Sequence, residues 1–227
     1  MNILRNIEPS SNVKRTVTIL GSTGSIGGST LDLVQHASKY FEVVSLTGNE
    51  NVKMLIRQAR MFKPKLAVIG NDNLYQELKA GLRDVNVRVA AGKDALCEAA
   101  ELDSDLVVAG IVGTAGLNPT LAAVRRGAII ALANKECLVC SGNLFLDEVE
   151  RSRATLLPID SEHNAIIPVL DIKHVASIDR LILTASGGPF INSSHKDMAN
   201  VTPTQAVKHP NWEMGAKISV DSATMMN

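Results

Sequence analysis

Aromatic residues, net charge and long apolar runs are all scarce in this 227-residue sequence. Lysine plus arginine and aspartate plus glutamate both number 23, so there is no excess positive charge to bind nucleic acid or an anionic membrane. No apolar run reaches the roughly 18 residues of a membrane span, and residues 1–15 lack the apolar core of a secretory signal. We therefore expect a cytoplasmic protein without a nucleic-acid or membrane partner.

Cysteine is scarce as well. The three cysteines are Cys97, Cys137 and Cys140, and this odd number argues against a disulfide framework. Cys137 and Cys140 form a C-x-x-C pair, but no second pair or histidines at ligand spacing accompany it, so the support for zinc is weak. We interpret both as core or near-core thiols of a helix.

Apolar residues, by contrast, make up 45% of the chain, enough for one large domain or for one full domain and part of another. Residues 16–20, Thr-Val-Thr-Ile-Leu, indicate a buried strand. Segments long enough for crossover helices separate the further strand candidates, which are residues 43–46, 66–69, 85–89, 106–109 and 128–133. This alternation predicts an α/β fold over residues 1–158, with a doubly wound, mostly parallel, Rossmann-like sheet and ligands at the carboxyl ends of its strands.

The first strand runs directly into a glycine-rich loop, Gly21-Ser22-Thr23-Gly24-Ser25-Ile26-Gly27, followed by a helical stripe that includes Leu31 and Val34. This order suits a pyrophosphate, because close backbone approach and free N–H groups at the positive end of a helix stabilise an anion. A tight turn that binds nothing is the alternative. The next strand ends in Thr47-Gly48-Asn49-Glu50-Asn51, where the adenosine ribose of a dinucleotide is expected.

One crossover helix has a clear predicted start. Asn118 can cap it and Pro119 suits the first helical position. Leu117, Leu121 and Val124 then line one face, so we expect a helix that packs on the sheet.

Two carboxylates, Asp160 and Glu162, stand two positions apart in the stretch Pro158-Ile-Asp-Ser-Glu-His-Asn164. In an extended or turning backbone their oxygens can converge, as a hard divalent cation requires. The alternative is a helix start, capped by Asp160 or Ser161. Lys135, after the last long strand, can reach a substrate oxygen or phosphate, or it can form a solvated pair with Glu136.

Beyond Glu162 the apolar pattern changes. Residues 178–183 indicate a strand, and Ser186-Gly187-Gly188 offers a hydroxyl beside two flexible glycines, which suits a phosphate or an ordinary turn. Residues 191–204 are polar and are expected to form a loop. The single tryptophan, Trp212, lies between Pro210 and Gly215, an arrangement that indicates a lid able to cover a ligand and exclude water.

Together these motifs closely resemble the 1-deoxy-D-xylulose 5-phosphate reductoisomerases of the non-mevalonate isoprenoid pathway. The matching stretches are Gly21 to Gly27, Leu132-Ala-Asn-Lys-Glu136, Pro158 to Ala165, Ser186-Gly-Gly-Pro-Phe190 and the long, irregular stretch from His209 to Asn227. The resemblance implies an enzyme that rearranges 1-deoxy-D-xylulose 5-phosphate and reduces the product with NADPH to 2-C-methyl-D-erythritol 4-phosphate. It also implies a dinucleotide-binding domain over residues 1–158 and the first part of an α+β catalytic domain over residues 159–227.

Residue roles follow from the same resemblance. The implied metal ligands, for Mn²⁺ or Mg²⁺ with Co²⁺ as a further option, are Asp160 and Glu162. The implied catalytic residues are Lys135, Ser161, Glu162, His209 and Trp212. The implied contacts to a phosphosugar substrate are Ser161, Ser186, His209, Ser222 and Asn227. The implied contacts to NADPH are Gly21, Thr23, Gly24, Ser25, Ile26, Asn49, Asn51, Asn134, Glu136 and Gly215.

Two departures from the family pattern matter. Glu50 stands where the family commonly has a basic residue near the adenosine 2′-phosphate, which weakens the expected preference for NADP. In the family, Met-Met-Asn is followed by Lys-Gly, by a glutamate that is the third metal ligand, and by a portion that completes a homodimer, whereas this sequence ends at Asn227. We therefore expect little or no turnover from this chain by itself and fraying of residues 222–227. A non-catalytic dinucleotide-binding module is the alternative function.

Overall fold

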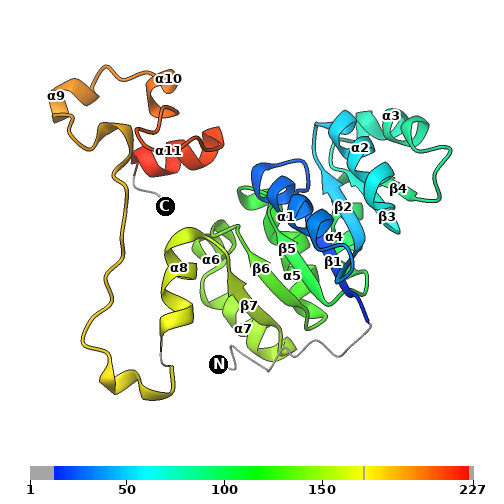
Figure 1. Ribbon diagram of the computed structural model, residues 1–227, viewed down its shortest axis with the longest axis horizontal. Helices are drawn as coiled ribbons and strands as arrows, with labels where there is room; N and C mark the ends of the chain where they lie inside the picture. Colours follow the sequence, from blue (N-terminus) through cyan, green and yellow to red (C-terminus); the bar gives the residue numbers. More distant parts are fainter. Residues whose placement is uncertain (1–12, 171, 225–227) are drawn as a thin grey trace. The chain divides into compact units, whose positions relative to one another are not determined.

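The computed structural model describes residues 13–170 and 172–224 (Figure 1). The chain divides into two compact units, one ending at Asp160 and the other beginning at Ser161. The first unit holds a β-sheet with helices packed on it. The described residues of the second unit form only helices, turns and loops.

Seven parallel strands form the sheet among the described residues, in the spatial order β4-β3-β2-β1-β5-β6-β7. The strand order reverses between β1 and β5, and a ligand crevice is expected at such a switch point. The strands are β1 Arg15–Leu20, β2 Phe41–Gly48, β3 Leu66–Ile69, β4 Arg88–Ala91, β5 Leu106–Ala109, β6 Ile129–Leu132 and β7 Thr155–Pro158.

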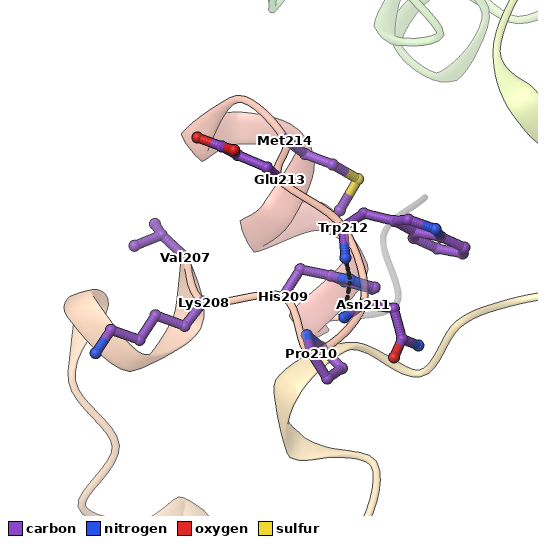
Figure 2. A pocket seen from close by; sticks show the side chains of 8 residues that line it. All are labelled: Val207, Lys208, His209, Pro210, Asn211, Trp212, Glu213 and Met214. Atoms are coloured by element: carbon purple, nitrogen blue, oxygen red, sulfur yellow. Dashed lines mark hydrogen bonds between the residues drawn. The ribbon is translucent and has the colours of Figure 1, made fainter.

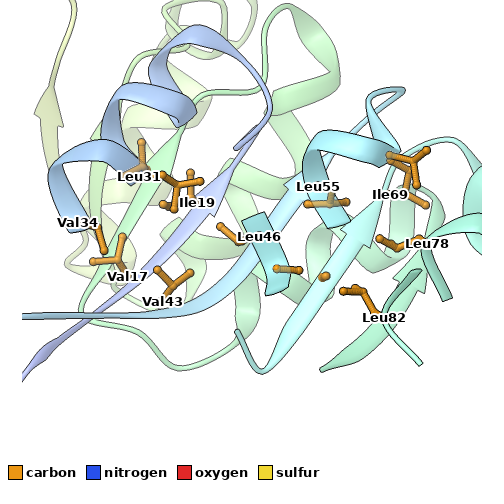
Figure 3. Packing of buried hydrophobic residues seen from close by; sticks show 14 of the residues in the cluster. Val17, Ile19, Leu31, Val34, Val43, Leu46, Leu55, Ile69, Leu78 and Leu82 are labelled. Atoms are coloured by element: carbon orange, nitrogen blue, oxygen red, sulfur yellow. The ribbon is translucent and has the colours of Figure 1, made fainter. Parts of the chain in front are cut away.

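Helices cover both faces of this sheet. On one face, α1 (Ser25–His36), α2 (Val52–Phe62) and α3 (Tyr75–Gly81) pack on the strands, and Figure 3 shows their leucine and valine side chains meeting those of β1, β2 and β3. The other face carries the helices α4 Gly92–Glu101, α5 Leu117–Arg125, α6 Glu136–Ser141 and α7 Asn143–Ser152. The prediction of a doubly wound α/β fold is therefore confirmed.

Burial on both faces explains why strands such as β3 and β5 are apolar throughout instead of alternating with polar residues. In β1, Ile19 belongs to the core of the first face and Leu20 to the core of the second. In β3, Ile69 belongs to the core of the first face and Val68 to a core cluster of the second. A short apolar run is therefore the local signal for strands such as these.

In the first unit, one predicted strand needs correction and one strand was missed. Residues 85–89 were expected to form a strand, but β4 begins only at Arg88, because Val85 and Val87 lie in the turn before it and pack there against the core. Strand β7 is missing from the predicted set. Its four residues, Thr155–Pro158, add an edge strand beside β6 and carry the chain to Asp160.

The predicted start of the helix near residue 118 is wrong. The helix α5 begins at Leu117, has no side-chain cap, and continues directly from a 3₁₀ turn, η2 (Thr114–Gly116). Because that turn leads into the helix without an extended residue, Asn118 already lies inside it. Pro119 is tolerated, since its missing N–H falls in the first turn, where no intrahelical acceptor exists.

In the second unit the predicted strand at residues 178–183 is not observed. The segment has no regular structure, and Leu181, Ile182 and Leu183 are more than 60% exposed. A strand needs a hydrogen-bonded neighbour, and no segment among residues 161–170 and 172–224 provides one. The helical elements of this unit are α8 Ser161–Ile166, η3 Ile167–Val169, η4 Ile172–Ser177, η5 Gly188–Phe190, α9 His195–Met198, α10 Pro203–Ala206 and α11 Ala216–Thr224.

The predicted loop at residues 191–204 contains short helices. Ser194 and Asp197 form a capping box that starts α9, and Thr202 and Gln205 form another that starts α10. Both are sequence signatures of a helix start that the polar composition concealed. Helix α11 includes Ser222 and continues to Thr224, and the remainder of the turn predicted to fray lies outside the described residues.

The cysteines differ from one another in burial. Cys137 is buried in the core, and burial raises the pKa of its thiol. Cys140 is exposed, so its interpretation as a core or near-core thiol is wrong, because α6 buries only the face that carries Cys137. All three cysteines are free.

None of the helices that the structure describes is long and apolar enough to span a membrane.

Candidate cofactor, metal and phosphate sites

The glycine loop between β1 and α1 is shaped by close backbone approaches. Gly21 has a φ of 82°, and a Cβ there would lie 2.8 Å from the carbonyl carbon and oxygen of Gly110, in the loop that follows β5. A Cβ on Gly27 would lie 2.4 Å from the oxygen of Gly21 and from the Cα of Ser22. Glycine is therefore required at both positions, once for the turn and once for packing of α1 on the loop.

The exposed edge of this loop has the character of an anion site. Gly24 occupies the N-cap of α1 without any side-chain cap, and Gly24 and Ser25 are exposed. The first N–H groups of a helix have no intrahelical acceptor, and the dipole of the 12-residue helix adds partial positive charge there. The loop lies beside the switch point between β1 and β5, where a dinucleotide is expected.

At the end of β2, the side chains already have partners. The Oδ1 atom of Asn51 caps α2 by accepting from the N–H of Met54 at 3.1 Å. The carboxylate of Glu50 accepts from Nδ2 of Asn71 at 3.0 and 3.2 Å. Asn49 lies next to Gly70, where a Cβ would come within 2.6 Å of its Oδ1. An acidic group is thus held at the position expected for the ribose.

Asn134 links the ends of β5 and β6. It is 3% exposed, and its Nδ2 donates to the carbonyl oxygens of Ile111 at 2.5 Å and Gly113 at 2.9 Å. Its Oδ1 is buried and has no hydrogen-bond partner among the described residues. Such an acceptor fits a ligand N–H donor, because a buried polar atom without a partner is costly. Lys135 and Glu136 follow it, half-buried, at the start of α6.

The carboxylate pair lies at the start of a helix. Asp160 directly precedes α8, which begins at Ser161, and the hydroxyl of Ser161 donates to Oε2 of Glu162 at 2.9 Å. Within residues 13–170 and 172–224, no three histidine, cysteine or acidic side chains are grouped as a metal site. Two carboxylates and a hydroxyl in consecutive positions form an oxygen donor set that suits Mg²⁺ or Mn²⁺. The metal assignment stays a prediction.

In the second unit a hydrogen-bonded cluster joins three of the predicted phosphate contacts. The hydroxyls of Ser186 and Ser222 lie 2.7 Å apart, and Nε2 of His209 lies 2.9 Å from the Ser186 hydroxyl. The N–H of Gly188 donates to the same hydroxyl at 3.3 Å. Residues separated by up to 36 positions are thereby brought together as a group of small donors.

The local backbone determines which nitrogen of His209 donates. Its Nδ1 accepts from the N–H groups of Asn211 at 3.2 Å and Trp212 at 3.1 Å (Figure 2). The ring proton of the neutral imidazole is therefore on Nε2, which donates to Ser186. The ring of Trp212 stacks on the imidazole at 4.7 Å between centroids, although the side chain is 58% exposed. Residues 207–214 line a shallow pocket.

The remaining candidates are distributed unevenly. Gly215 is exposed and directly precedes α11 in the second unit, whereas the other nine predicted NADPH contacts belong to the first unit. Asn227 lies outside the described residues.

Sequence analysis missed Thr47 and Gln58, which hold the glycine loop from its buried side. A polar residue on the apolar face of α2 is the signal that marks Gln58.

Comparisons with known proteins agree with this geometry. The family model described as 1-deoxy-D-xylulose 5-phosphate reductoisomerase matches residues 17–142, which are more than half of the chain. The chain belongs to the 1-deoxy-D-xylulose 5-phosphate reductoisomerase family. A second model, for the C-terminal domain of the 1-deoxy-D-xylulose 5-phosphate reductoisomerases, matches residues 156–227. The resemblance inferred from the motifs is therefore confirmed.

Curated relatives cover nearly all of the chain. The reductoisomerase of Rhodospirillum centenum is 53% identical over 213 residues, which are 94% of this chain and 53% of that protein. The reductoisomerase of Rhizobium etli is 54% identical over 215 residues, with 94% of this chain and 54% of that protein covered. The chain thus spans about half the length of the curated reductoisomerases it matches.

Solved structures give the same result. The reductoisomerase of Zymomonas mobilis in complex with NADPH is 50% identical, with a TM-score of 0.85, and the match covers 94% of this chain and 55% of that one. A second reductoisomerase, in complex with NADPH, fosmidomycin and magnesium, is 43% identical, with a TM-score of 0.89 and the same coverage.

Proposed function

We propose that this chain carries the NADPH-binding and substrate-phosphate segments of a 1-deoxy-D-xylulose 5-phosphate reductoisomerase. The reaction would be the metal-assisted rearrangement of 1-deoxy-D-xylulose 5-phosphate, followed by NADPH-dependent reduction to 2-C-methyl-D-erythritol 4-phosphate. The observation that carries the proposal is the uncapped, glycine-lined N-terminus of α1 at the sheet's switch point, in a chain of this family.

The first unit would bind NADPH. The loop from Gly21 to Ile26 would receive the pyrophosphate through its backbone N–H groups, and Asn49 and Asn51 would lie beside the adenosine ribose. The buried Oδ1 of Asn134 would accept a hydrogen bond from the cofactor, with Glu136 as a further contact. Gly215, in the second unit, stays a contact that the family resemblance implies. NADPH complexes of relatives support this proposal.

The cluster of Ser186, His209 and Ser222 would bind the phosphate of the sugar. Each side chain presents an O–H or N–H donor, and the hydroxyl of Ser186 lies within hydrogen-bond distance of Ser222 and of His209. Asn227 is proposed as a further contact. Trp212, stacked on His209, would close over the ligand and exclude water from a reactive aldehyde.

Asp160 and Glu162 would hold the divalent cation, Mg²⁺ or Mn²⁺ with Co²⁺ as an option, and Ser161 and Lys135 would contact the oxygens of the substrate. When bound, the cation supplies a Lewis acid for the rearrangement and NADPH supplies the hydride. Lys135 adds a positive charge near developing oxyanions. A magnesium-containing relative supports the choice of metal. Homodimer assembly and a cytoplasmic location stay predictions of the family resemblance and the sequence.

Isothermal titration of the chain with NADPH tests the proposal. Binding in the micromolar range is expected, and absence of heat at millimolar NADPH would exclude the cofactor site.

Mn²⁺ binding followed by electron paramagnetic resonance tests the carboxylates. Asp160→Asn should weaken Mn²⁺ binding, while Asp147→Asn, an exposed change on α7, should not. A steady-state NADPH oxidation assay with metal and substrate then separates an enzyme from a non-catalytic dinucleotide-binding module.

The acidic residue at the ribose position gives a test of cofactor specificity. Glu50→Lys should tighten NADPH binding and leave NADH binding nearly unchanged, because a carboxylate repels the 2′-phosphate and an ammonium attracts it. Titration of both nucleotides into the variant measures the ratio. Glu77→Lys, an exposed change of the same charge on α3, is the matched control. An unchanged ratio of affinities would contradict the placement of the 2′-phosphate beside Glu50.

A further inference from the structure

Ser22 is the buried residue of an otherwise accessible glycine loop. It has no exposed surface, while Gly24 and Ser25, two and three positions later, are exposed. A buried serine must have its hydroxyl, N–H and carbonyl satisfied by neighbours. The neighbours of Ser22 come from β2 and α2, more than 20 residues further along the chain.

Gln58, on the buried face of α2, binds Ser22 through both ends of its amide. Its Oε1 accepts from the Ser22 hydroxyl at 2.8 Å, and its Nε2 donates to the Ser22 carbonyl at 2.8 Å. Thr47 completes the arrangement. Its carbonyl accepts from the N–H of Ser22 at 2.7 Å, and its hydroxyl accepts from the N–H of Gly21 at 2.8 Å.

Packing alone does not require an amide at position 58. The side chain is 8% exposed and lies on a helix face whose other buried residues are Val52, Leu55 and Ala59. An apolar side chain of the same length would fill the space, but it would leave the carbonyl of Ser22 without its donor. The amide therefore acts on the loop and not on the core.

We propose that Gln58 is a positioning residue that holds the glycine loop in the shape that binds the pyrophosphate of NADPH. This inference rests on the proposed role of the loop as the cofactor site. Gln58 is buried and both ends of its amide bind Ser22, so it would act on the cofactor through Ser22. It fixes Ser22, and Ser22 sets the course of the backbone into the exposed N–H groups at the start of α1. Asn51, beside the expected ribose, caps the same helix, so one element orients the two parts of the site.

The test compares two ligands and three variants of the whole chain. Gln58→Met keeps the length of the side chain and removes both hydrogen bonds. Gln58→Glu keeps the acceptor and loses the donor to the Ser22 carbonyl. Gln76→Met, an exposed change on α3, is the control. Dissociation constants for NADPH and for 2′-AMP, which lacks a pyrophosphate, are measured by calorimetry, together with amide hydrogen exchange over residues 21–27.

Gln58→Met should weaken NADPH binding about tenfold and leave 2′-AMP binding within about twofold. In Gln58→Met, the amides of residues 21–27 should also exchange faster. Gln58→Glu should change NADPH affinity and exchange in the same direction. Gln76→Met should change neither. Unchanged NADPH affinity in a folded Gln58→Met chain would overturn the proposal, as would an equal loss for both ligands. If the unsubstituted chain binds no NADPH, the proposed function fails instead, and unchanged exchange in the variant would still show that Gln58 does not hold the loop.

Discussion

The first unit buries apolar side chains on both faces of its sheet, whereas in the second unit, among residues 161–170 and 174–224, only Gly188 and Ser219 are buried. The hydrogen bonds of the two units differ as well. The glycine loop is held by residues up to 36 positions away, while many bonds of the second unit are helix caps that join residues three positions apart. Long-range packing therefore stabilises the first unit, and local backbone chemistry shapes much of the second.

The largest expected effect comes from two neighbouring glycines in the first unit. Gly27→Ala should destabilise the chain by about 2 kcal/mol and abolish NADPH binding, because the new Cβ meets backbone atoms 2.4 Å away. Gly28→Ala, one residue on in the same helix, meets nothing within 4 Å and should stabilise it by about 0.5–1 kcal/mol. Urea denaturation measures the free energy of unfolding of both variants. Equal effects at the two positions would show that α1 does not pack closely on the loop.

Asn134 should be the next most sensitive position. Asn134→Leu leaves the carbonyls of Ile111 and Gly113 without their donor, so the free energy of unfolding should fall by about 1–3 kcal/mol. NADPH affinity should fall with it, since the Oδ1 acceptor is lost. Asn118→Leu, an exposed change on α5, is the control. Normal stability and affinity in the Asn134 variant would contradict its role as the link between the loops after β5 and β6.

A carboxylate at the opposite end of the sheet should give the first unit a pH-dependent stability. Asp105 accepts from the N–H and hydroxyl of Thr16, both at 2.8 Å, and these bonds lower the pKa of its carboxyl. A lowered pKa stabilises the fold above the ordinary value of about 3.9, and the contribution is lost as the pH falls through the folded value. Asp105 is exposed and asparagine keeps one acceptor oxygen, so Asp105→Asn should cost less than about 1 kcal/mol at pH 7.

The matched control for this carboxylate is Asp147→Asn, an exposed change on α7. Thermal melts at pH 7 and at about pH 3 should differ less for Asp105→Asn than for the unsubstituted chain. If Asp105→Asn and the unsubstituted chain show the same pH dependence, the Thr16 bonds do not stabilise the ionised carboxylate.

The smallest global effect is expected in the second unit. Ser194→Ala removes the cap of α9 and should destabilise that single helical turn by about 1 kcal/mol. The thermal transition of the sheet should not move, because the cap contacts only its own turn. Hydrogen exchange at residues 195–198 should rise alone. A shift in the thermal transition of the sheet would contradict the view that the first unit is stabilised by packing and α9 only by local bonds.

Sequence predicts well where a signal lies within a few consecutive residues. The strand from Thr16 to Leu20 and the glycine loop after it were recognisable because both patterns are local. The expected strand at residues 178–183 failed for the opposite reason, since a strand exists only when a neighbour pairs with it. Cys140 was misjudged because helix periodicity does not say which face of a short helix is covered.

The sequence by itself determined the fold class, the alternation of strands and helices over most of the first unit, the glycine loop and the family. These depend on apolar runs, on glycine and on contiguous motifs that need no partner elsewhere. Only the tertiary structure decided that Gln58 binds Ser22, that Asn134 joins two loops, and that Ser186, His209 and Ser222 meet. Each of these contacts joins residues at least 21 positions apart, and they meet only when the chain packs in three dimensions.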